Sequence, residues 1–91
     1  MDVLHALSDP VRLEIVRILA DDGHEVACGH MGLPVGKSTS SHHLRVLREA
    51  GVVRARDEGT RRFYQLRRDD LDRRFPGLLD SVLHAAHAGS A

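Results

Sequence analysis

Cysteine is nearly absent from this chain, which has one, Cys28, among 91 residues. A single cysteine excludes a disulfide within the chain and fits a reducing compartment. Long apolar runs are also missing, because no stretch approaches the roughly 20 apolar residues of a membrane-spanning helix. The start of the chain lacks the basic and apolar regions of a signal peptide, since Asp2 follows Met1 directly. We therefore expect one soluble, cytoplasmic domain, residues 1–91, with no membrane partner.

The chain also lacks a net charge, with 13 Lys and Arg against 13 Asp and Glu. These charges are nevertheless segregated along the sequence. Residues 37–68 hold nine basic residues against three acidic ones, a balance of +6, and the remainder holds four against ten, a balance of −6. Such segregation favours one basic side that meets a polyanion. The alternative is an accidental clustering of solvated charges.

The stretch from residue 36 to residue 51 predicts a recognition helix over about 37–50. His43, Leu44, Leu47 and Ala50 recur at helical spacing and mark the inward face. The other face carries short polar and basic side chains, which suit a DNA groove. Its DNA-contact candidates are Lys37, Ser38, Thr39, Ser41, His42 and Arg45. Arg45 is the best placed for a two-point contact with guanine, whereas His43 is expected to support the helix and not to read bases.

The segments around this helix predict a second helix and a β-hairpin. Asp9 and Pro10 are typical of the start of a helix over about 10–20, which Gly23 can end. Residues 24–35 are ambiguous between a short strand and a short helix. Residues 52–56 and 61–66 are strand-like around a turn over 57–60, which predicts a hairpin "wing" over about 52–66. Arg61 and Arg62 should point to opposite faces and are its candidate DNA contacts; one of Phe63 and Tyr64 should pack inward.

The end of the chain predicts a short helical turn over 70–74, capped by Asp69, and a last helix over about 76–88. Its apolar residues follow a full amphipathic pattern, which favours a dimer surface over purely internal packing. The candidate dimer residues are Val3, Leu4, Leu78, Leu79, Val82, Leu83 and Ala86. The polar face holds Asp80, His84 and His87, whose side chains suit zinc, nickel or cobalt. A solvated polar face is the preferred alternative, so we expect no metal and no cofactor.

This order of elements predicts a mainly α fold with a β-hairpin: a winged helix-turn-helix with a C-terminal dimerisation helix. Residues 7–19, 38–53 and 59–66 resemble the second helix, the recognition helix and wing of ArsR-type (ArsR/SmtB) bacterial repressors. The resemblance implies a homodimeric repressor that binds an imperfect inverted repeat. Metal-sensing members carry a cysteine pair in the region of residues 26–30, where this chain has Cys28 alone, and Ser40 stands where many relatives place an apolar residue.

Two patterns resemble the sites of other activities but do not predict them. The run from Gly32 to Thr39 looks like a phosphate-binding loop, but three residues separate its glycines instead of four. Neighbouring serines and histidines at residues 38–43 do not face one another on a helix, so they do not predict a hydrolase. The leading interpretation is a sequence-specific DNA-binding regulator and not an enzyme. The alternatives are a metal-sensing repressor and a winged helix that binds only protein.

Overall fold

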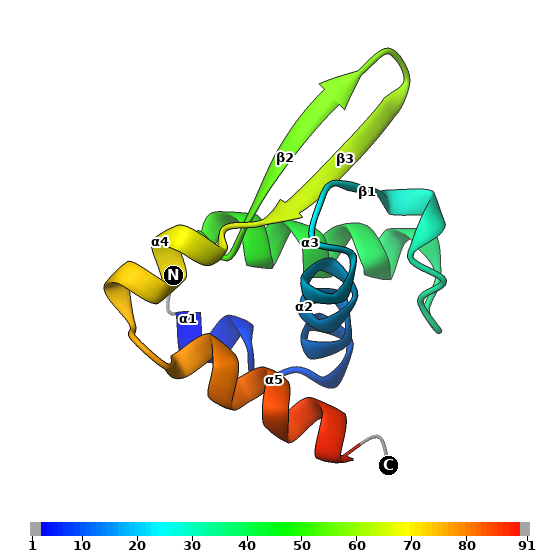
Figure 1. Cartoon of the computed structure of the whole chain (residues 1–91). Coiled ribbons are helices and arrows are strands. Elements are labelled where there is room, and N and C mark those ends of the chain that lie inside the picture. Colours follow the sequence, from blue (N-terminus) through cyan, green and yellow to red (C-terminus); the bar gives the residue numbers. More distant parts are fainter. Residues whose placement is uncertain (1–2, 90–91) are drawn as a thin grey trace.

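Two helices of 13 residues and a hairpin dominate the molecule (Figure 1). The computed structural model describes the backbone of residues 3–89 and the side chains of residues 3–85. Along this range the elements are α1 (Val3–Ala6), α2 (Pro10–Asp22), β1 (Val26–Ala27), the 3-10 turn η1 (Cys28–His30), α3 (Lys37–Glu49), β2 (Val53–Glu58), β3 (Arg61–Leu66), α4 (Arg68–Arg74) and α5 (Leu78–Gly89). This mainly helical architecture with a wing confirms the predicted fold class.

Helix α2 begins and ends where its local sequence predicts. The carboxylate of Asp9 accepts hydrogen bonds from the backbone N–H groups of Val11 and Arg12, at 2.8 and 3.1 Å. These bonds satisfy N–H groups that have no partner within the helix, and Pro10 fits the first helical position. At the other end Gly23 adopts φ of 78°, in the left-handed region that glycine enters without a steric penalty.

The segment between α2 and α3 resolves the ambiguity of the sequence in favour of a strand. β1 pairs with β3, with Val26 opposite Tyr64 and Ala27 opposite Phe63. The helical alternative is realised only as the 3-10 turn η1, which leads into an irregular connection to α3. Two glycines and a proline between residues 29 and 34 disfavour a longer helix.

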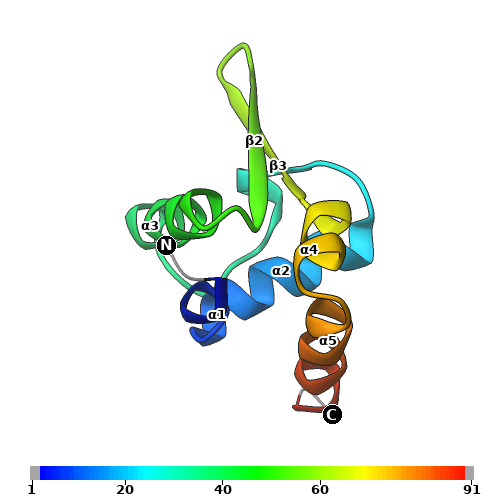
Figure 2. The same ribbon diagram turned by 90° about the vertical axis from the view of Figure 1, so that its left-hand side faces the viewer.

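The wing lies within its predicted range, but its first strand runs further toward the turn than predicted. Both strands run for six residues, and only Gly59 and Thr60 connect them, so Asp57 and Glu58 belong to β2 and not to the turn. Gly59 has φ of 61°, as tight two-residue hairpin turns require. β3 lies between β1 and β2 in a three-stranded antiparallel sheet. The hairpin projects away from the helices (Figure 2).

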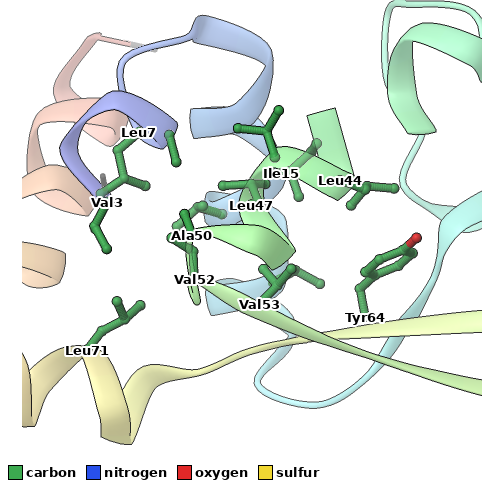
Figure 3. Close-up of a cluster of buried hydrophobic side chains, with 14 of the residues drawn as sticks. Val3, Leu7, Ile15, Leu44, Leu47, Ala50, Val52, Val53, Tyr64 and Leu71 are labelled. Atoms are coloured by element: carbon green, nitrogen blue, oxygen red, sulfur yellow. The ribbon is translucent and has the colours of Figure 1, made fainter. Parts of the chain in front are cut away.

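The hydrophobic core gathers side chains from every described helix except the short turn η1, and from both long strands (Figure 3). Ile15 and Leu19 of α2 meet Leu44 and Leu47 of α3, and each is exposed by 1% or less. This burial explains the direction of α3, because the apolar edge of the helix faces α2 and leaves the polar face outward. Within residues 3–89, no helix is both long enough and apolar enough to cross a membrane.

The C-terminal elements differ from the sequence prediction in three ways. α4 starts at Arg68 with Arg67 at its N-cap position, so Asp69 lies inside the first turn instead of capping it. α5 starts at Leu78, because Pro76 and Gly77 form the turn before it. The amphipathic face of α5 is also partly covered by its own chain, since Leu79 is only 2% exposed.

Candidate nucleic-acid interface

A groove lies between α3, the residues before it and the start of β3. Its lining includes five cationic side chains and, among the described residues, no carboxylate. The cationic residues are Lys37, Arg45, Arg48, Arg61 and Arg62. Ser38, Ser41 and His42 also line the groove. The structure therefore brings together seven of the eight predicted DNA contacts from two elements that are distant in sequence.

The outward face of α3 follows from the burial of its other face. Leu44 and Leu47 are fully buried, so the side of the helix that faces away from them points into solvent. Ser40 joins the buried face, at 7% exposure, while Ser41 is exposed. The Arg45 side chain is 64% exposed, and its Nε lies 3.8 Å from Oε1 of Glu49. That distance is too long for a hydrogen bond, so Arg45 can extend toward a ligand.

The N-terminus of α3 faces the same groove. Gly36 occupies the N-cap position, and its carbonyl accepts the first helical hydrogen bond from the Ser40 N–H, at 2.9 Å. The N–H groups of the first turn have no acceptor within the helix and favour a negatively charged group. Lys37 and Ser38 line the groove at this end. Thr39 is exposed but is not part of the groove lining, unlike the other candidates on this helix.

Arg62 lies on the groove face of the wing. Strand alternation places it on the same side as Tyr64, which is 7% exposed and packs into the core. Its guanidinium donates two hydrogen bonds to Asp57 on the opposite strand, at 2.7 and 3.2 Å. These bonds from Arg62 lower the pKa of the Asp57 carboxyl group. Asp57 thus holds the Arg62 side chain while the wing is free of a ligand.

The other face of the wing carries a stack of cations on an aromatic ring. The guanidinium carbons of Arg56 and Arg61 lie 5.0 and 5.3 Å from the centre of the Phe63 ring. Arg56 also donates to Glu25, at 2.9 Å, which ties the hairpin to the residue before β1. The hydrogen bond with Arg56 lowers the pKa of Glu25. Arg61 and Arg62 therefore lie on opposite faces, as predicted, with Arg61 at the edge of the groove near the turn.

Comparisons with known proteins agree with this geometry. A family model described as a helix-turn-helix domain matches residues 7–56. The chain is 37% identical over 82 residues to the uncharacterized HTH-type transcriptional regulator YceK of Bacillus subtilis, which covers 88% of this chain and 82% of that protein. It is 37% identical over 71 residues to the arsenical resistance operon repressor of Staphylococcus xylosus, covering 77% of this chain and 67% of the repressor.

The chain belongs to the ArsR-type family of winged helix-turn-helix transcriptional regulators. The crystal structure of the transcriptional repressor BigR from Xylella fastidiosa superimposes with a TM-score of 0.64 at 33% identity, over 79% of this chain and 81% of that one. Membership in the ArsR-type family confirms a DNA-binding transcriptional regulator and confirms that the chain is not an enzyme.

Several residues that line the groove of this ArsR-type chain are missing from the predicted DNA contacts, and Arg48 and Thr60 are two of them. Arg48 lies one turn after Arg45 on the same face of α3, so helical spacing alone could have added it. Thr60 is the second residue of the tight turn, and only the position of the hairpin relative to α3 places it beside the groove. Cys28 also lines the groove, at the start of η1.

The candidate metal residues on α5 do not form a site in the part of the structure that is described. Asp80 accepts a hydrogen bond from Arg68, at 3.1 Å, and His84 is exposed. The side chain of His87 lies outside the described residues. Among side chains 3–85, no group of three His, Cys, Asp or Glu residues is arranged to hold a metal ion.

The candidate dimer residues divide into covered and accessible side chains. Val3 and Leu79 are 3% and 2% exposed in a single chain, so they belong to the core and offer little surface to a partner. This differs from the sequence prediction, which could not tell which apolar residues the chain itself covers. Leu4 is 58% exposed, and three residues of α5 remain partly exposed: Leu78, Val82 and Leu83. The side chain of Ala86 lies outside the described residues.

Proposed function

We propose that this regulator is a homodimeric repressor that binds an inverted-repeat operator. In the complex, α3 enters the major groove and the wing lies against the adjacent backbone. The observation that carries the proposal is the groove between α3 and β3, whose lining has five cations and no described carboxylate. The names of the relatives support repression, since both the S. xylosus protein and BigR are called repressors.

The accessible apolar side chains support the dimer. Leu4 on α1 and Val82 and Leu83 on α5 keep exposed surface after the core has formed. α5 lies at the end of the molecule opposite the tip of the wing (Figure 2), so a partner on α5 leaves the groove free. A twofold dimer presents two recognition helices, and an operator with two related half-sites matches that symmetry.

The operator itself is found by selecting duplexes from a random pool with the purified chain. We expect the selected sequences to share two inverted half-sites whose centres are separated by about one helical turn or a multiple of it. Enrichment of a single, unrepeated half-site would contradict the dimer. Failure to retard any duplex at low salt would contradict DNA binding and favour a winged helix that binds protein.

Arg45 tests the reading face of α3 on the selected duplex. Arg45→Ala should weaken binding by about 1–3 kcal/mol and relax the base preference at one position of each half-site, because a two-point contact with guanine is lost. The matched control is Arg17→Ala, which removes an arginine of α2 that pairs with Glu14 and Asp21 and does not line the groove. A repeated selection that returns the same base preference for Arg45→Ala would exclude Arg45 as a base contact.

The dimer is tested by molar mass in solution. Leu4→Asp places a charge on an exposed apolar position and should shift the chain from dimer to monomer without unfolding it. His5→Asp puts the same charge on the neighbouring exposed residue of α1 and serves as the control. An unchanged dimer in Leu4→Asp would remove α1 from the interface.

A further inference from the structure

Arg12 is a cation buried inside the domain, away from the groove. It lies on α2 and is 8% exposed. Arginine is seldom buried without partners, because transfer of its charge out of water is costly. A fully apolar side chain at this position would fill the same core without that penalty. The contacts of the guanidinium therefore show what the charge is used for.

Those contacts join α1 to the recognition helix. Nε of Arg12 donates to the carbonyl of Ala6, at 2.7 Å, and Nη2 lies 3.4 Å from the carbonyl oxygen of His5. Nη1 lies 3.2 Å from Nδ1 of His43, in the middle of α3. One planar group thus spans the end of α1 and the helix that carries the groove residues.

The contact with His43 constrains the protonation state of the ring. A guanidinium has donors only, so Nδ1 of His43 must accept the hydrogen bond with a lone pair. The ring is then neutral, with its proton on Nε2. A proton on Nδ1 would point an N–H group at the N–H groups of Arg12 and abolish this bond. The His43 side chain is 12% exposed, so water can replace the lost partner only in part.

The charged and titratable groups that face His43 come from α2 and from α3 itself. Asp9, at the cap of α2, has Oδ2 3.8 Å from Nδ1 of His43. His42 is the neighbour on α3, with ring centres 5.6 Å apart. Burial raises the pKa of Asp9, but the hydrogen bonds from the N–H groups of Arg12 and Val11, together with the charges of His43 and Arg12, lower it by more. Asp9 is therefore an anion that can form an ion pair with a protonated His43.

We propose that Arg12 and His43 are positioning residues that set the orientation of α3 on α1 and α2, and that they do so only while His43 is neutral. Protonation moves the partner of His43 from Arg12, which is bound to α1, to Asp9 at the cap of α2. His43 lies between His42 and Arg45, two groove residues, so a shift at His43 displaces both. Sequence-specific DNA binding therefore weakens as pH falls and His43 takes up a proton. This inference rests on the DNA binding of the proposed function.

Two substitutions at His43 separate the hydrogen bond from the protonation. His43→Gln keeps an acceptor for Arg12 but cannot titrate, and His43→Leu removes the acceptor. Each chain is titrated with the duplex selected by the native chain and with a random duplex of equal length, from pH 8 to pH 5.5. We expect the native ratio of selected to random affinity to fall about tenfold, the size expected when a hydrogen bond to a charged group is lost. His43→Gln should hold a high ratio throughout, and His43→Leu a low one.

The control is His24→Gln, an exposed histidine beyond the end of α2, which should keep the pH dependence of the native chain. Circular dichroism at each pH establishes that every chain is folded. A purely structural role would lower the melting temperature and leave the affinity ratio of the folded chain unchanged, which would overturn the inference. A pH dependence in His43→Gln equal to that of the native chain would overturn it as well.

Two further outcomes are distinguishable. If His43→Leu does not fold, the ring-nitrogen chemical shifts of His43 in the native chain show which nitrogen carries the proton. A neutral ring protonated on Nδ1 at pH 8 would overturn the inference. If the native chain retards neither duplex at any pH, the proposed DNA binding fails and the inference fails with it. Native binding with an unchanged ratio in both His43 variants overturns the inference alone.

Discussion

The guanidinium of Arg62 lies on the groove face of the wing, where it donates two hydrogen bonds to the Asp57 carboxylate. Arg62→Ala removes this cation without disturbing the core, because the side chain is 44% exposed. Binding of a phosphate requires Arg62 to exchange one anion for another. Asp57 is itself well exposed, so water can replace its lost partner and the exchange is not prohibitive. We expect Arg62→Ala to weaken binding to all sequences to a similar degree.

The size of the effect follows from counterion release. Each neutralised phosphate contributes about 0.9 to the slope of log affinity against log salt. A dimer presents Arg62 twice, so Arg62→Ala should reduce the slope by about 1.8. A rise in salt concentration from about 50 to about 200 mM is a fourfold change. It should therefore reduce the affinity of both chains, but the factor of reduction for Arg62→Ala should be roughly 12 times smaller than the factor for the native chain.

The assay is a fluorescence anisotropy titration at several salt concentrations, with the selected duplex and with a random one. Arg17→Ala is again the control, since it removes an arginine that lies outside the groove. The slope for Arg17→Ala should match that of the native chain. A native slope in Arg62→Ala would refute a phosphate contact from the groove face of the wing. A loss confined to the selected duplex would instead assign Arg62 to base reading.

Three further predictions concern charge and stability. Asp57→Asn frees Arg62 and removes a negative charge beside the groove, so it should tighten binding to both selected and random duplexes; weaker binding would mean that Asp57 orients Arg62 productively. Leu47→Ala leaves a cavity at a fully buried position and should cost about 2–5 kcal/mol in urea unfolding, and a smaller loss would indicate that the core collapses around it. Asp9→Ala removes the cap of α2 and should cost about 1 kcal/mol near neutral pH. Because the pKa of Asp9 is lowered on folding, its contribution to the free energy of unfolding is present above about pH 4 and disappears as pH falls through the folded-state pKa. The native chain and Asp9→Ala should therefore have the same free energy of unfolding in strong acid. A difference that persists there would refute the cap.

Local sequence signals were sufficient for the elements whose ends depend on their own residues. The start of α2 at Pro10 and its end before Gly23 follow from cap chemistry, which acts within a few residues. The sequence also predicts the hairpin, but it predicts a turn of four residues instead of two, because Asp57 and Glu58 resemble turn residues. Their pairing with Arg62 and Arg61 across the ladder extends β2 instead.

The candidate site was predictable to the extent that it lies on one helix face. Helical spacing places Ser41, His42 and Arg45 on the surface, and burial of Leu44 confirms that placement. Spacing could not reveal that Thr39 lies outside the groove lining, since a groove is formed by two elements and not by one face. For the same reason the pair of Arg62 with Asp57 was not foreseen.

Caps, apolar periodicity and the charge segregation of residues 37–68 are properties of neighbouring residues, so they were enough to predict the class of fold and the family. The tertiary structure alone decided which of those residues meet. It placed Leu79 in the core and left Leu4 exposed, and it joined Arg12 to His43, 31 positions further along the chain. Apolar patterning indicates that a side chain prefers burial. Only the packing of one element on another decides which residues cover that side chain and which groups bind a buried charge.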